Sequence, residues 1–132
     1  MTALHPPESP IRRLGGLIAL RTIIEDFVQR MVDDAMIGFM FRDADLLSLA
    51  QREFEFTARF LGANVPYTGR PLRDSHAPHR IMGGQFDRRK QILHEVLMDH
   101  RVPPDLRAQW LDHVEKLRPV ITAQGRGVCT EA

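Results

Sequence analysis

The residues best suited to chemistry lie in one short stretch, residues 66–86, around the imidazole of His76. Helix-breaking residues flank the histidine on both sides: Gly69 and Pro71 precede it, and Gly83 and Gly84 follow it. Its bulky apolar or aromatic neighbours along the chain are Tyr67, Ile81 and Phe86. A neutral imidazole nitrogen is a good ligand for iron, provided that the second ring nitrogen has a partner that fixes the ring. His76 could therefore hold a metal-bearing planar cofactor between apolar side chains.

His79 competes for this role, because it follows His76 by three residues and would lie close to the same helical face. The two imidazoles could bind zinc, but no cysteine or third histidine stands at a matching spacing, so a structural zinc site has weak support. A surface or core histidine without a ligand is the ordinary alternative for a lone imidazole. The remaining histidines form no constellation, and we expect them on polar faces: His5, His94, His100 and His113.

Length and composition restrict the class of protein. A chain of 132 residues indicates one domain that can bury a core and a cofactor, with residues 1–11 as a flexible N-terminal arm, 12–122 as the domain and 123–132 as a flexible C-terminal tail. The chain has 18 lysine and arginine residues and 17 aspartate and glutamate residues, so it lacks the excess of positive charge that is typical of nucleic-acid-binding proteins. We find no signal-peptide pattern and no apolar stretch long enough for a membrane span. Cys129 is the only cysteine, which excludes an intramolecular disulfide and fits a cytoplasmic protein.

The spacing of apolar residues predicts an all-α domain with four long helices and a short one that carries His76. Over residues 17–32, apolar side chains recur at steps of three and four from Leu17 to Met31. Ile18 and Val28 widen this stripe, so we expect the first long helix to be largely buried.

Local signals indicate where the other long helices begin or end. Asp45 is a suitable N-cap for a helix over about residues 45–61, and Gly62 can end that helix in a left-handed conformation. A third helix is predicted over about residues 85–100. The fourth opens at residues 103–105, where prolines and an early carboxylate favour a helix start. The inward positions expected for these last two helices are Phe86, Ile92, Leu93, Val96 and Leu97, then Leu106, Trp110, Leu111, Val114, Leu117 and Ile121.

Several short motifs occur in a characteristic order along the chain. They are Leu14-Gly15-Gly16, Glu25-Asp26-Phe27, Phe41, Pro66-Tyr67-Thr68-Gly69, His76 and Val102-Pro103. Their order and spacing over roughly residues 12–122 resemble those of a truncated haemoglobin, the short bacterial globin with two helices packed over two, and most closely its group I. The resemblance implies a two-over-two helical sandwich that binds haem b (iron protoporphyrin), with His76 as the iron ligand. A small diatomic ligand, oxygen or nitric oxide, would bind at the open position of the iron.

The same resemblance implies which residues would contact the haem. Phe41 would pack flat on it, and Tyr67 and Arg80 could face its propionates, the arginine through charge-assisted hydrogen bonds. His79 would be a rim residue or a propionate contact, and a backbone carbonyl one turn earlier, near Leu72 or Arg73, could orient the ring of His76. The full set of implied contacts is Phe41, Leu49, Tyr67, Leu72, His76, His79, Arg80, Ile81 and Phe86.

The distal side, where a ligand would bind, departs from the family pattern. Many relatives carry a tyrosine at the position of Val28 and a glutamine at the position of Glu53. Losing one hydrogen bond of about 1.5–3 kcal/mol would weaken oxygen retention by roughly ten- to a hundredfold. Ionised Glu53 can only accept hydrogen bonds; burial could keep it protonated and make it a donor, or it pairs with Arg52 or points to solvent. The implied distal residues are Val28, Phe41, Leu49, Arg52 and Glu53.

Two other interpretations stay open. A globin-fold protein that has lost haem and serves as a binding or regulatory module would suit Val28 and Glu53, whereas His76 and Phe41 favour haem. A plain helical interaction domain with an accidental likeness would have a pocket too small for a porphyrin. Redox turnover, such as nitric oxide oxidation with a reductase as partner, follows only from the resemblance. The residue pattern specifies no oligomeric state.

Overall fold

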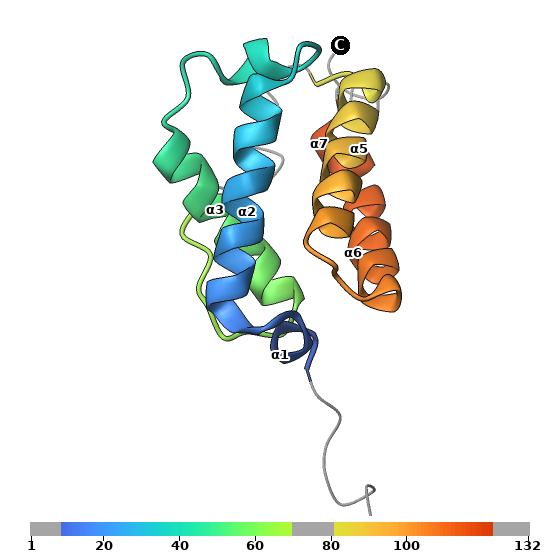
Figure 1. Cartoon of the computed structure of the whole chain (residues 1–132). Helices are drawn as coiled ribbons and strands as arrows, with labels where there is room; N and C mark the ends of the chain where they lie inside the picture. Colours follow the sequence, from blue (N-terminus) through green and yellow to red (C-terminus); the bar gives the residue numbers. More distant parts are fainter. Residues whose placement is uncertain (1–8, 70–80, 123–132) are drawn as a thin grey trace, which may run out of the picture.

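The computed structural model describes residues 9–69 and 81–122, and the regular structure within them is helical (Figure 1). The elements are α1 (Pro10–Leu14), α2 (Gly16–Asp33), the short 3₁₀ helix η2 (Gly38–Phe41), α3 (Leu46–Phe60), α5 (Gly83–Asp99), α6 (Pro104–Lys116) and α7 (Arg118–Ile121). The all-α prediction is confirmed. Among the helices of these residues, none has the length and apolar character needed to cross a membrane.

Two pairs of helices form the domain. α2 packs against α3 in one layer, and α5 packs against α6 in the other, with α7 continuing from α6 (Figure 1). The layers meet where α2 contacts α5. Among the largest fully buried side chains are Phe27 of α2 and Phe86 of α5. The arrangement is the two-over-two sandwich that the sequence predicted.

The burial of α2 follows the predicted stripe except in its first turn. Leu20, Phe27 and Met31 are buried as expected, but Leu17 is 42% exposed and Ile18 is 86% exposed. Ile18 precedes Leu20 by two residues, which places the two side chains about 160° apart around the helix axis. The prediction that Ile18 and Leu17 belong to the buried stripe was therefore wrong.

The ends of α3 follow from local chemistry. Asp45 Oδ1 accepts hydrogen bonds from the backbone N–H groups of Leu47 (3.1 Å) and Ser48 (3.3 Å), which confirms it as the N-cap. After the helix, Gly62 has φ +97°, a left-handed conformation that side chains disfavour. The backbone N–H of Ala63 then bonds to the carbonyl of Ala58, and the chain turns toward the loop of residues 62–69.

The last helical region is divided where one helix was expected. α6 ends at Lys116 and α7 begins at Arg118. Pro119 has no N–H to donate to the carbonyl four residues earlier, which accounts for the break. The inward positions predicted for α5 are all buried, as are Leu106, Trp110, Val114 and Ile121, whereas Leu111 and Leu117 are partly buried.

The start of the described chain differs from the expected boundary at residue 12. α1 begins at Pro10, capped by Ser9, and the Ile11 side chain is only 8% exposed. The backbone N–H of Ile11 also donates to the carbonyl of Leu61 (3.1 Å). Residues 10 and 11, which we had assigned to the arm, therefore belong to helix α1. The rest of that arm and the tail lie outside the described residues.

Candidate functional site

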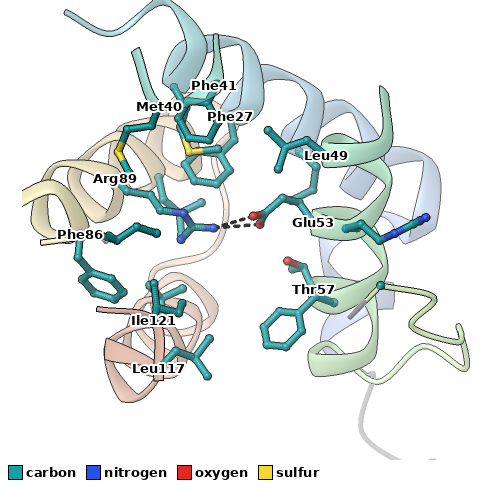
Figure 2. A pocket seen from close by; sticks show the side chains of 18 of the residues that line it. Phe27, Met40, Phe41, Leu49, Glu53, Thr57, Phe86, Arg89, Leu117 and Ile121 are labelled. Carbon is teal, nitrogen blue, oxygen red and sulfur yellow. Dashed lines mark hydrogen bonds and ion pairs between the residues drawn. The ribbon is translucent and has the colours of Figure 1, made fainter. Parts of the chain in front are cut away.

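A cavity of about 480 Å³ opens between the two layers. Its walls come from α2, η2, α3, α5, α6 and α7, together with the loop residues Tyr67, Thr68 and Gly69 and with Ile81 before α5. Figure 2 shows mainly apolar side chains pointing into this space, among them Phe27, Phe41, Leu49 and Ile121. The volume lies within the range of about 300–1,000 Å³ that is usual for sites of small molecules and cofactors.

The structure brings many of the predicted site residues together at this cavity. Those that line it are Phe41, Leu49, Arg52, Glu53, Tyr67, Ile81 and Phe86. They come from η2, α3, the loop before residue 70, the segment just before α5 and the start of α5. The fold therefore collects residues that are up to 45 positions apart, from 41 to 86.

Val28 is the exception among the predicted residues that the structure describes. Its side chain is only 4% exposed, but it is not among those that line the cavity, whereas the preceding Phe27 is. Adjacent residues on a helix point about 100° apart, and the wall is formed by the face of Ile24, Phe27 and Met31. Phe27 therefore forms this wall, and the distal role of Val28 stays a prediction.

The expected iron ligand and three of its neighbours cannot be placed in the cavity. Leu72, His76, His79 and Arg80 lie outside the described residues. The residues on either side of that segment, Gly69 and Ile81, both line the cavity.

An ion pair spans the cavity from one layer to the other. Arg89 Nη2 of α5 lies 3.0 Å from each carboxylate oxygen of Glu53 on α3 (Figure 2). The Arg89 guanidinium carbon is also 5.0 Å from the centre of the Phe27 ring, close enough for a cation–π interaction. Glu53 thus pairs with Arg89, which corrects the alternatives of Arg52 or solvent. Arg52 instead lies 3.6 Å from Glu55, measured from Nη1 to Oε2.

Glu55 attaches the loop of residues 62–69 to α3. Its carboxylate accepts hydrogen bonds from the backbone N–H of Thr68 (2.8 Å), from the Thr68 hydroxyl (2.9 Å) and from the Gln51 amide (2.8 Å). Only 4% of Glu55 is exposed. The backbone hydrogen bond from Thr68 is the main cause that lowers the pKa of Glu55 below its usual 4.5. Glu55 therefore fixes Thr68, and with it Tyr67 and Gly69, at the rim of the cavity.

Two aromatic contacts shape the wall next to this loop. Tyr67 meets Phe56 edge to face at 6.0 Å, and burial raises the pKa of the Tyr67 hydroxyl. The imidazole of His113 stacks on Phe60, with ring centres 3.9 Å apart and planes 8° from parallel. Its Nε2 is buried without a hydrogen-bond partner among the described residues, and burial is the main cause that lowers the pKa of His113. The expectation of His113 on a polar face was therefore wrong.

Arg89, Glu55 and His113 are titratable residues at this site that the sequence analysis did not predict there. A signal for Arg89 was present, because it stands three residues after Phe86 and four before Leu93, both predicted inward positions. Glu55 and His113 carried no comparable signal, since their partners lie in a loop and on another helix.

Comparisons with known proteins agree with this architecture. Residues 12–123 match the family model of bacterial-like globins. The group 1 truncated haemoglobin GlbN of Mycolicibacterium paratuberculosis is 29% identical over 124 residues, covering 94% of this chain and 91% of that protein. The truncated haemoglobin of Tetrahymena pyriformis in its Fe(III) form superposes with a TM-score of 0.81 at 18% identity, covering 87% of this chain and 98% of the other.

A third relative has the same fold. The 2/2 haemoglobin of a Synechococcus species, in the cyanomet state and with covalently attached haem, superposes with a TM-score of 0.71 at 23% identity over 91% of this chain and 96% of the other. Since the family model covers most of the sequence, the chain belongs to the bacterial-like globins, and its helices form the two-over-two sandwich of the truncated haemoglobins that it resembles.

Proposed function

We propose that this protein binds haem b in the cavity between its layers and holds a small diatomic ligand, oxygen or nitric oxide, at the iron. The observation that supports the proposal is that seven predicted site residues, five of them predicted haem contacts, line one cavity of about 480 Å³. The residues present fit such a group, because the wall is chiefly apolar and aromatic and its few polar side chains gather near the Glu53–Arg89 pair and the loop of residues 62–69. Haem in the related Synechococcus protein is consistent with it.

Each part of the cavity would have its own task. Phe41, Leu49 and Phe86 would pack on the porphyrin and exclude water. His76 would be the iron ligand, since both residues that flank its segment, Gly69 and Ile81, line the cavity. Tyr67, His79 and Arg80 would lie near the propionates. When bound, haem iron supplies an open coordination position for a small molecule, and the protein sets access and polarity there.

The residues on the distal side of the cavity favour rapid release of bound oxygen over its storage. The hydroxyl donor of many relatives has no counterpart in Val28, and the cavity wall at this point is formed by Phe27. The loss of this hydroxyl by itself would lower oxygen retention by roughly ten- to a hundredfold. We infer a protein that binds its ligand transiently. Redox turnover such as nitric oxide oxidation, with a reductase as partner, and a cytoplasmic location suggested by the single cysteine belong to the same proposal.

A haem-free binding or regulatory module is the second candidate. The observation that favours it is the Glu53–Arg89 ion pair, which joins the two walls directly across the cavity. Its guanidinium and carboxylate offer a donor and an acceptor to a small polar ligand that needs no haem.

Absorption spectroscopy separates these two functions. Purified protein is measured as isolated, after addition of haem, and after reduction under carbon monoxide. A sharp Soret band that shifts with carbon monoxide is expected in the wild type and in His79→Ala, and loss of haem is expected in His76→Ala. Folding of each variant is checked by circular dichroism. In a His76→Gly variant, added imidazole should restore haem binding.

Two results would count against the proposal. A wild type that takes up no stoichiometric haem would favour the haem-free module. Equal loss of haem in His76→Ala and His79→Ala would refute the assignment of a single iron ligand.

A further inference from the structure

We infer that Arg89 is the residue by which this cavity recognises a small anion, and that Glu53 competes with the anion for the guanidinium. The ligand class is a monoanion that can coordinate ferric haem, such as fluoride, azide or nitrite. The inference rests on the proposed haem function. It adds a preference for anionic over neutral ligands, which neither the apolar wall nor a neutral hydroxyl would provide.

The position of Arg89 is the first argument. Among the described residues that line the cavity, the arginines are Arg52 and Arg89 and the carboxylate is Glu53. Arg52 lies near Glu55, which is already engaged with Thr68 and Gln51. Arg89 instead extends from α5 toward α3 and meets Glu53 across the cavity (Figure 2). Of the two, Arg89 is the arginine whose guanidinium crosses the space where a molecule would be held.

The hydrogen-bond geometry is the second argument. Both carboxylate oxygens of Glu53 are contacted by one nitrogen of Arg89, Nη2, at 3.0 Å. A guanidinium carries donors on three nitrogens, and the strongest carboxylate pairs use two of them side by side. Within the described residues, Nε and Nη1 of Arg89 make no hydrogen bond to a protein acceptor. Arg89 therefore keeps donors for a second acceptor while Glu53 holds it.

The surroundings of the pair are the third argument. The side chains of Arg89 and Glu53 are 21% and 20% exposed, so both charges are partly removed from water. The ring of Phe27 lies 5.0 Å from the guanidinium carbon and supports it from an apolar side. A charge-assisted hydrogen bond in such a setting changes affinity by about ten- to a hundredfold. Neutral donors of the same wall, such as the Thr57 hydroxyl, would not distinguish an anion from a neutral ligand.

The test measures ligand affinity in the haem-loaded ferric protein by absorption titration with fluoride and with azide, at constant ionic strength and neutral pH. Arg89→Met should weaken the affinity for both anions by about ten- to a hundredfold. Glu53→Gln should strengthen it, because the competing negative charge is removed while the shape of the side chain is kept. The affinity of the reduced protein for carbon monoxide, a neutral ligand, should change by less than about threefold in both variants.

Arg88→Met is the matched control. Arg88 stands next to Arg89 on α5 and is also ion-paired, with its Nη2 2.6 Å from Oδ1 of Asp34, but it does not line the cavity. This variant should leave both anion affinities unchanged.

The possible outcomes are distinct. Haem uptake by the wild type with equal anion affinities in Arg89→Met, Glu53→Gln and wild type would overturn the inference alone. A wild type that takes up no haem would overturn the proposed function and the inference together. If Arg89→Met does not fold, Glu53→Gln still decides, because misfolding cannot produce the tighter anion binding that we expect.

Discussion

Replacing Glu55 should loosen the loop that borders the cavity, because this one carboxylate accepts hydrogen bonds from both the backbone and the hydroxyl of Thr68. A hydrogen bond to a charged group contributes about 1.5–3 kcal/mol to stability, and a neutral one about 0.5–1.5 kcal/mol. In Glu55→Gln the bond from the Thr68 N–H becomes neutral, and the new amide faces the Gln51 amide, its donor in the wild type. We expect a loss of about 1–2 kcal/mol in the free energy of unfolding.

The assay is urea denaturation followed by far-ultraviolet circular dichroism. Glu95→Gln is the control, since Glu95 accepts from Gln91 four residues earlier (3.1 Å), as Glu55 does from Gln51, but on an exposed face with no loop attached. It should change stability by less than about 0.5 kcal/mol. Equal free energies of unfolding for Glu55→Gln and Glu95→Gln would refute the reasoning that Glu55 holds the loop.

The pH dependence gives an independent check. The pKa of Glu55 is lowered below 4.5 in the folded state, so between the two values the unfolded chain binds more protons. The stability that Glu55 contributes is therefore complete above about pH 4.5 and is lost as the pH falls through the lower, folded pKa. The difference between wild type and Glu55→Gln should be largest near neutral pH and should shrink in acid.

Two further predictions concern the walls and the end of α3. Burial lowers the pKa of His113 below 6.5, so the stability of the wild type should fall as the pH drops from about 6.5 toward the folded pKa. The variant His113→Phe can still stack on Phe60 and should abolish this loss. The free energy of unfolding is measured at about pH 7.5 and at about pH 5.5. An unchanged pH slope in the variant would contradict the burial of the imidazole. Gly62→Ala should lower the free energy of unfolding by about 1–2 kcal/mol, because residue 62 has a φ of +97°. Gly84→Ala in α5 should be neutral or stabilising, since an added Cβ would meet only Met36 Cε at 3.9 Å. Thermal melts compare the two variants, and equal melting temperatures would refute the argument.

The fold was predictable where the determining chemistry is local. Asp45 and Gly62 mark the ends of α3 through bonds and dihedral angles that involve only the next few residues. The first turn of α2 was not predictable in this way. Leu17 and Ile18 are apolar, but their burial depends on which other elements cover that turn, and the period of the helix already places Ile18 opposite Leu20.

Helix geometry alone predicts part of the ion pairing at the site. Arg52 is the cation nearest to Glu53 in sequence, but neighbouring residues on a helix do not face each other, and Arg52 lies near Glu55 three positions on. Arg89 is 36 residues away from Glu53, yet its spacing from Phe86 and Leu93 places it on the inward face of α5. A partly buried charge needs an opposite charge or hydrogen bonds to offset its desolvation. An inward arginine in one layer and an inward glutamate in the other are therefore expected to meet, and the packing of α3 and α5 on either side of the cavity decides that they do so across the space where a ligand would bind.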